Sequence, residues 1–136
     1  MRLFIDTNVI IDLLAARQPF ADDAARLFTL ADKREVKIFT SSTTVTTTYY
    51  LLNKELKQDK ARAAVSKLLT LVEVIDARHL GVIRAINDIQ FKDFEDAVQY
   101  QSALQAKAKI LVTRNTKDFN LSSISVMTPK QVFGVL

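Results

Sequence analysis

Three separate segments of the chain carry acidic side chains of a kind that can hold a metal ion against a phosphate. They are Asp6, the pair Asp93 and Asp96, and Asp118. Several carboxylates with no histidine or cysteine among them are the ligands that hard cations such as Mg²⁺ or Mn²⁺ prefer. An ion held in this way can bridge to a phosphate, orient a water molecule and stabilise a leaving oxygen. The acids therefore suggest phosphodiester hydrolysis.

Each of these acids also has a simpler structural explanation. A carboxylate beside a helix N-terminus is stabilised by the helix dipole, so Asp6 and Asp93 are candidates for capping roles. If a helix begins near Asp93, then Asp93 and Asp96 share a face, which is costly for like charges unless a cation lies between them. Asp118 and Asn115 are both compatible with an Asx-turn in a polar loop. Only the set as a whole favours a site.

The hydrophobic pattern predicts the elements that position these acids. Short apolar runs without alternation predict buried parallel strands, at residues 3–5, 36–39, 72–75, 110–112 and, more weakly, 125–127. Stretches with helical spacing lie between them, at residues 9–14, 24–30, 61–69, 82–86 and 97–104. Strands that alternate with helices predict a parallel sheet flanked by helices. Ligands of such sheets gather beyond the C-terminal ends of the strands, where Asp6 and Asp118 are expected.

Helix boundaries are predicted at three further places. Residues 40–50 are rich in strand-forming threonines, yet their apolar spacing favours a helix, capped by Ser41 or Ser42. Asp59 is the expected N-cap of the helix at 61–69. Thr128 before a proline predicts the start of a last helix.

The size and composition of the chain fit one folded domain, residues 1–136. The absence of cysteine excludes a disulfide scaffold, a thiolate zinc site and a cysteine nucleophile. The net charge of +4 mildly favours a polyanionic partner. Because neither a signal peptide nor an apolar run of membrane-spanning length is visible, a cytoplasmic location is expected.

Other polar and aromatic side chains are interpreted mainly as structural. Asp12 is expected to be a solvated charge on the first helix, and His79, the only histidine, is expected on the surface. Tyr49 and Tyr50 are able to stack on bases, but their helical spacing with leucines favours the core. Arg114 adjoins an acidic motif and either contacts phosphate or balances charge.

The ordered set of motifs resembles the PIN-domain family. The segment from Phe4 to Leu14 resembles the opening of these proteins. Asp93-Phe94-Glu95-Asp96-Ala97 resembles their third acidic motif, in a form typical of a subgroup with an Asp-Phe-x-Asp pattern. The segment from Leu111 to Phe119 resembles the fourth motif. The order and spacing match over nearly the whole chain.

This resemblance implies a three-layer α/β/α PIN-like fold with a central, mostly parallel sheet of four or five strands. It implies a divalent-metal-dependent endoribonuclease that uses Mg²⁺ or Mn²⁺ on RNA. It also implies a VapC-like toxin of a type II toxin–antitoxin pair. The partners that follow are an RNA substrate, a small antitoxin protein and a second copy of the chain, with no membrane.

The resemblance also assigns residues to roles. Asp6 and Asp96 are implied as metal ligands and catalytic residues, and either Asp118 or Asn115 takes the fourth position. Asp93 is a further candidate ligand. Supporting or substrate-binding roles fall to Thr7, Asn8, Thr47, Thr113, Arg114 and Asn115.

One position departs from the family pattern. A glutamate is usual in the helix after the second strand, and Thr47 stands in its place. A neutral hydroxyl does not replace the lost charge, so metal affinity should fall unless Asp93 compensates. The alternative function is a catalytically weakened PIN-fold module that binds RNA or a protein without cutting. A phosphotransfer domain is a weaker alternative, because Asn8 stands where aspartate-nucleophile phosphatases need a second aspartate.

Overall fold

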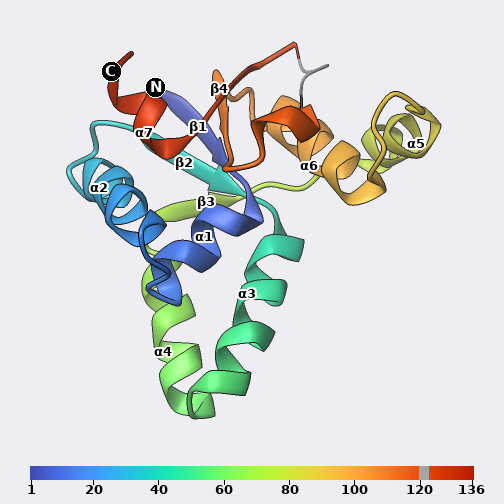
Figure 1. Cartoon of the computed structure of the whole chain (residues 1–136). Helices are drawn as coiled ribbons and strands as arrows, with labels where there is room; N and C mark the ends of the chain where they lie inside the picture. The colour runs from blue at the N-terminus through green and yellow to red at the C-terminus, as the bar shows by residue number, and fades with distance from the viewer. Residues whose placement is uncertain (120–122) are drawn as a thin grey trace.

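The centre of the molecule is a five-stranded sheet, seen in Figure 1 in a computed structural model that describes residues 1–119 and 123–136. The strands are β1 (Arg2–Ile5), β2 (Lys37–Thr40), β3 (Val72–Val74), β4 (Ile110–Val112) and β5 (Ser125–Met127). Their order is β3-β2-β1-β4-β5, and every neighbouring pair is parallel. The predicted parallel sheet and its five strands are confirmed.

Helices connect the strands and cover both faces of the sheet (Figure 1). They are α1 (Thr7–Leu14), α2 (Phe20–Asp32), α3 (Ser42–Glu55), α4 (Gln58–Leu68), α5 (His79–Asn87), α6 (Phe94–Gln105) and α7 (Pro129–Phe133), with a 3-10 turn η1 (Thr116–Phe119). The side chains of the central strand β1 alternate between two apolar clusters. Leu3 and Ile5 pack with α1, α2 and α7, whereas Phe4 packs with α5 and α6. The fold is therefore the predicted three-layer α/β/α arrangement.

α3 and α4 form an arm that projects from the sheet (Figure 1). A small apolar cluster of Leu52, Ala61 and Val65 holds the two helices together. α3 confirms the helical interpretation of residues 40–50, and its N-cap is Ser41, whose hydroxyl accepts from the Thr44 N–H at 3.2 Å. The arm is relevant to the site because α3 directly follows β2, which is parallel to β1. The first turn of α3 therefore lies at the same edge of the sheet as Asp6.

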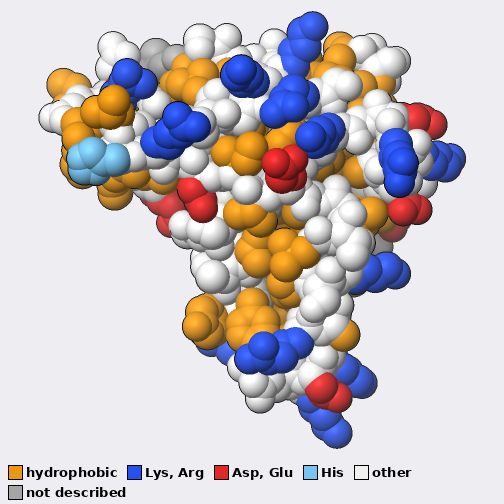
Figure 2. Space-filling view, turned by 180° about the vertical axis from the view of Figure 1, so that it is seen from behind, with side chains coloured by type: hydrophobic (Ala, Val, Ile, Leu, Met, Phe, Trp, Pro, Cys, Tyr) orange, Lys and Arg blue, Asp and Glu red, His pale blue; other side chains and the backbone are white. Residues whose placement is uncertain are grey.

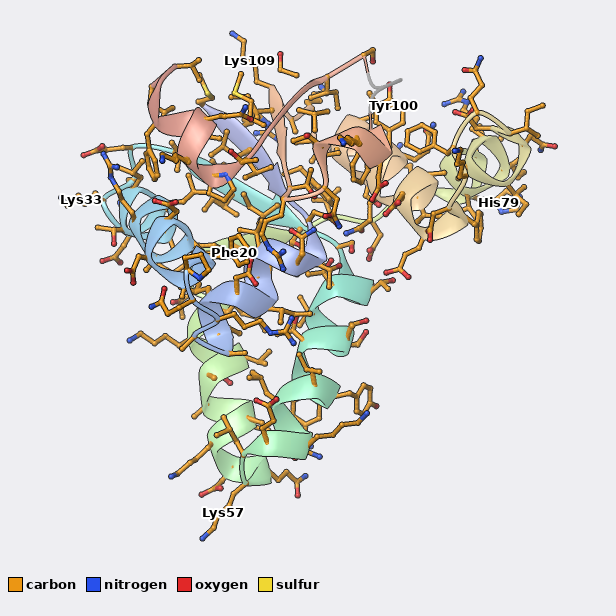
Figure 3. The ribbon with its side chains drawn as sticks, viewed as in Figure 1. Phe20, Lys33, Lys57, His79, Tyr100 and Lys109 are labelled. Atoms are coloured by element: carbon orange, nitrogen blue, oxygen red, sulfur yellow. The ribbon has the colours of Figure 1, made fainter. Side chains whose placement is uncertain are left out.

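Three predictions of local structure have different outcomes. The N-cap of α4 is Lys57, seen near the tip of the arm in Figure 3, so the assignment of this cap to Asp59 was wrong by two residues. Tyr50 is 65% exposed rather than in the core, because it lies on the arm, away from the sheet. His79 is exposed at the start of α5, as predicted. In the part of the chain that the structure describes, no helix has the length and hydropathy needed to cross a bilayer.

Candidate active site

Asp6 lies at the C-terminal end of β1 and is held by hydrogen bonds on both carboxylate oxygens. It is the N-cap of α1, and only 6% of it is exposed. Its Oδ1 accepts from the Thr7 N–H at 2.8 Å and from Nε2 of Gln99 at 3.1 Å. Its Oδ2 accepts from Oγ1 of Thr113 at 2.9 Å, with Nδ2 of Asn8 farther away at 3.5 Å. Four donors thus fix the carboxylate in one orientation.

Thr113 and Asn8 join the end of β4 to the start of α1. Thr113 is fully buried, and its Oγ1 accepts from Nδ2 of Asn8 at 3.1 Å and from the Asn115 N–H at 3.1 Å. Oδ1 of Asn8 accepts from the Arg114 N–H at 3.2 Å. The ends of β1 and β4 are therefore locked together, as expected for neighbouring parallel strands.

The predicted acids gather around Asp96 in the first turn of α6. Burial raises the pKa of Asp96 to about 7, and the negative charges of Asp93, Asp6, Asp118 and Glu95 contribute in that order. Charges act on one another over roughly 8–10 Å at physiological ionic strength. The four aspartates that the sequence singled out therefore lie near one another beyond the C-terminal end of β1, in a region called the acidic crevice below.

Asp93 caps a helix, which is the structural role that the sequence offered beside metal binding. It is the N-cap of α6, and its Oδ1 accepts from the Asp96 N–H at 3.0 Å. Asp118 is exposed in η1, and its N–H donates to the backbone oxygen of Asn115, which is also exposed. Asp93 and Asp118 thus reach the crevice from solvent-exposed positions, whereas Asp6 forms its buried wall.

Gln99 contacts Asp6, and the sequence did not single it out. It is 3% exposed on α6, and its side chain contacts the starts of both α1 and α3. Nε2 donates to Asp6 and, at 2.9 Å, to Oγ1 of Thr44, while Oε1 accepts from Oγ of Ser41 at 2.6 Å. The available signal was its spacing, since Gln99 lies three residues after Asp96 and so on the same helix face.

The hydroxyl that enters this hydrogen-bonded group from α3 belongs to Thr44 and not to Thr47. Thr44 is fully buried, and its Oγ1 lies 2.8 Å from Oγ1 of Thr7. Thr47 is exposed one turn later. Where the family pattern has an acid, the crevice of this chain is therefore bordered by neutral hydroxyl groups.

Asp12 is a buried partner of Arg114, so its prediction as a solvated helix charge was wrong. It is 1% exposed, because α1 turns it toward the loop that follows β4. Nε of Arg114 donates to Oδ2 at 2.6 Å, and Nη2 donates to Oδ1 at 3.2 Å. The guanidinium also lies 4.1 Å from the centre of the Phe20 ring. Arg114 is thus fixed by a forked ion pair beside the crevice.

The chemistry of the crevice fits a hard cation. Its donors are carboxylate, amide and hydroxyl oxygens, which suit Mg²⁺ or Mn²⁺. Within residues 1–119 and 123–136, no three acidic or histidine side chains lie close enough together to hold a metal ion by themselves. An ion bound among these acids would therefore take its remaining ligands from water and phosphate oxygens.

Comparison with known proteins relates this geometry to a family. A sequence model of the PIN domain matches residues 2–117. The chain is 32% identical over 137 residues to Ribonuclease VapC1 of Aquifex aeolicus, which covers 96% of this chain and 92% of that protein.

Two solved structures are similar in fold. VapBC-1 from nontypeable Haemophilus influenzae has a TM-score of 0.72 at 18% identity, over 96% of this chain and 99% of that one. VapC20 of Mycobacterium tuberculosis, described as a toxin that cleaves the sarcin-ricin loop, has a TM-score of 0.61 at 22% identity, over 80% and 86%. The similarity in sequence spans nearly the whole chain, and the sheet and its acidic crevice agree with it: this protein belongs to the PIN domain family.

Proposed function

We propose that the protein is a divalent-metal-dependent endoribonuclease that hydrolyses RNA phosphodiester bonds. The observation that carries this proposal is the convergence of Asp6, Asp93, Asp96 and Asp118 on one crevice, where their mutual repulsion helps to raise the pKa of Asp96 to about 7. A protein tolerates such an arrangement when a cation offsets the charge. The relationship to a ribonuclease of the VapC type supports the same activity.

Asp6, Asp96 and Asp118 would hold Mg²⁺ or Mn²⁺, with Asp93 completing the negative charge of the crevice. The bound ion would supply a polarised water and stabilise the leaving oxygen. The residues of the chain prepare this chemistry. Thr113 and Gln99 each occupy one oxygen of Asp6, so its carboxylate does not rotate when a ligand binds. Thr7 presents a half-buried hydroxyl at the start of α1.

The direct test replaces Asp6 by asparagine. Asparagine caps a helix as well as aspartate does, so Asp6→Asn should fold normally. It removes the charge at the buried wall, and we expect RNA cleavage in Mg²⁺ or Mn²⁺ to fall by more than about 100-fold. The control is Asp59→Asn, the same change at an exposed position of the arm, which should cleave like the wild type. Full activity of purified Asp6→Asn, or of the wild type in EDTA, would refute the proposal.

A catalytically weakened module that binds RNA or protein is the second candidate. One observation favours it. Thr47 stands where the family pattern has an acid and is exposed, and the α3 side chain that joins the hydrogen-bonded group around Asp6 is the neutral Thr44. The acids around Asp96 argue against it, because a binding module has no use for repelling carboxylates in a crevice. Metal binding separates the two candidates.

We also propose a biological setting, the toxin of a type II toxin–antitoxin pair that acts on RNA in the cytoplasm and is blocked by a small antitoxin. The similarity to VapC1 and to VapBC-1 supports this setting. The Asp-Phe-x-Asp motif at the start of α6 supports the further proposal that the chain belongs to a corresponding subgroup of the family.

A homodimer belongs to the same proposal. Hydrophobic side chains are exposed around His79 on α5, as Figure 2 shows on the back of the molecule. Leu80 is 63% exposed and Ile86 is 61% exposed, and a second copy of the chain is the partner that we propose for this face.

A further inference from the structure

A pocket of about 340 Å³ lies beside the acidic crevice, on the side of the loop that follows β4. Its walls include Phe20, Asp23, Arg114, Asn115 and Lys130. We infer that this pocket binds a nucleotide of the RNA chain next to the cleaved bond and prefers guanine. The inference rests on the proposed ribonuclease activity, to which it adds a substrate preference. The volume is within the range of small-ligand sites.

The pocket and the crevice share a wall. Arg114 and Asn115 directly follow Thr113, whose Oγ1 donates to Asp6 and accepts from the Asn115 N–H. One buried hydroxyl thus connects the wall of the pocket to the carboxylate that would hold the metal. An RNA strand whose phosphate reaches the crevice is therefore positioned to place a neighbouring nucleotide in the pocket.

Phe20 and Arg114 stack on each other, and the outer face of this flat pair offers a stacking surface to a base. Phe20, labelled at the start of α2 in Figure 3, is 42% exposed. The guanidinium of Arg114 lies over its ring at 4.1 Å and is held there by the two hydrogen bonds to Asp12. Bases of single-stranded RNA stack on aromatic rings and on guanidinium planes. Because Asp12 fixes the plane of Arg114, little side-chain entropy is lost when a base binds.

The polar groups of the pocket indicate which base it accepts. Asp23 is half-buried, and an ionised carboxylate only accepts hydrogen bonds. Guanine presents two adjacent N–H donors on its Watson–Crick edge, which match the two oxygens of a carboxylate. Adenine presents an unprotonated ring nitrogen at the middle of that edge, which a carboxylate repels. The charge of Arg114 is offset by Asp12, so Lys130 is the cation available for the nucleotide's phosphate.

The test is an NMR titration of the ¹⁵N-labelled full chain in Mg²⁺ with GMP, IMP and AMP. IMP is the matched ligand, because it differs from GMP only by the missing 2-amino group. We expect saturable shifts of the amides of Phe20, Asp23 and Asn115, with GMP binding at least about fivefold more tightly than IMP and AMP. Asp23→Asn should abolish most of the difference between GMP and IMP.

Two variants test the stacking surface. Phe20→Leu keeps an apolar side chain but removes the flat ring, and should weaken GMP binding by at least about fivefold. Phe133→Leu is the control, because its ring also lies under an arginine, Arg26 at 4.0 Å, but outside the pocket. It shares α7 with Lys130, so it also reports any general loosening of that helix. We expect it to bind GMP like the wild type.

The inference is overturned if the amides of Phe20, Asp23 and Asn115 do not shift at a GMP concentration about 10-fold above the dissociation constant of any other nucleotide site on the chain. It is also overturned if GMP and IMP bind equally tightly. Unchanged GMP binding by Phe20→Leu would also overturn it. None of these readouts requires cleavage. A chain that cuts RNA but fails them retains the proposed function without this preference. A chain that passes them but cuts no RNA has a nucleotide pocket and lacks the proposed activity.

Discussion

Gln99 illustrates how a neutral side chain positions an acid. Its amide donates to Asp6 and Thr44 and accepts from Ser41 while almost completely buried. An amide is well suited to this place, because it has donors for the carboxylate and an acceptor for the serine, whereas an acid would add a further negative charge. We therefore regard Gln99 as a positioning residue that acts through Asp6.

Replacement of Gln99 by methionine tests this role. Gln99→Met removes one buried hydrogen-bond partner each from Asp6, Ser41 and Thr44, so the free energy of unfolding should fall by about 1–3 kcal/mol. Cleavage and Mn²⁺ affinity should fall by about 10–100-fold at a temperature where the variant remains folded. Gln101→Met, on the same helix, is the control for a simple loss of polarity. Wild-type Mn²⁺ affinity in folded Gln99→Met would show that the residue is merely structural.

The carboxyl group of Asp96 predicts a dependence of stability on pH. Its pKa is raised to about 7 in the folded chain, so the folded state holds the proton more tightly than the unfolded state. Without metal, the contribution of Asp96 to stability should therefore be fully present below about pH 4, fall between about pH 4 and 7, and be absent above that range. Asp96→Asn removes this loss.

In EDTA at pH 8, Asp96→Asn should consequently be more stable than the wild type. The full shift corresponds to about 4 kcal/mol, and solvent screening of this partly exposed group reduces the expected gain to roughly 1–2 kcal/mol. Denaturant unfolding at pH 5 and pH 8 measures it, with Asp59→Asn as the control. A variant that gains nothing at pH 8 would show that neither burial nor the neighbouring acids raise the pKa of Asp96 in the folded chain.

The sequence predicted the acids better than the residues that hold them. An aspartate after an apolar run stands out, because the end of a parallel strand is where ligands bind. Gln99 and Thr44 look like ordinary polar positions of helices, and only the packing of α3 and α6 against the end of β1 buries them. The misreading of Asp12 has the same cause, since burial of a helix charge depends on which loop lies over it.

At the scale of elements, the ion pair between Asp12 and Arg114 ties α1 to the loop after β4. Arg114→Met would leave the carboxylate of Asp12 buried without a cation, which should cost about 3–5 kcal/mol of unfolding free energy. The double variant Asp12→Leu with Arg114→Met should recover most of this loss. Lys37→Met breaks the exposed pair with Glu73 and should cost at most about 1 kcal/mol. A cost for Arg114→Met as small as that of Lys37→Met would contradict the buried pair.

The elements themselves were largely predictable. Apolar runs of the right length gave the strands, and the spacing of residues 40–50 outweighed their threonine content because Thr44 and Thr48 face the interior of the molecule. The hydroxyl of Thr48 donates to the backbone oxygen of Thr44, so a strand-forming residue is satisfied inside a helix. The exposure of Tyr50 was missed, because the spacing alone does not say where a helix leaves the sheet.

At the scale of the whole molecule, alternation of strands and helices predicted a parallel three-layer fold, and β1 at its centre places Asp6 beside the ends of both β2 and β4. The strand order and the projecting arm were beyond prediction from periodicity, since both depend on how the connections cross over the sheet. We expect the crevice so formed to bind a divalent ion although hydroxyl groups replace the usual glutamate.

A Mn²⁺ titration followed by thermal unfolding tests that claim most directly, because it requires no knowledge of the RNA target. Binding to the folded state alone stabilises it by about 2.7 kcal/mol at 100 times the dissociation constant. We predict that millimolar Mn²⁺ raises the melting temperature of the wild type by at least about 3 °C, and that Asp6→Asn shows little of this rise. A wild type that does not respond to Mn²⁺, or an Asp6→Asn variant that responds equally, would contradict the account.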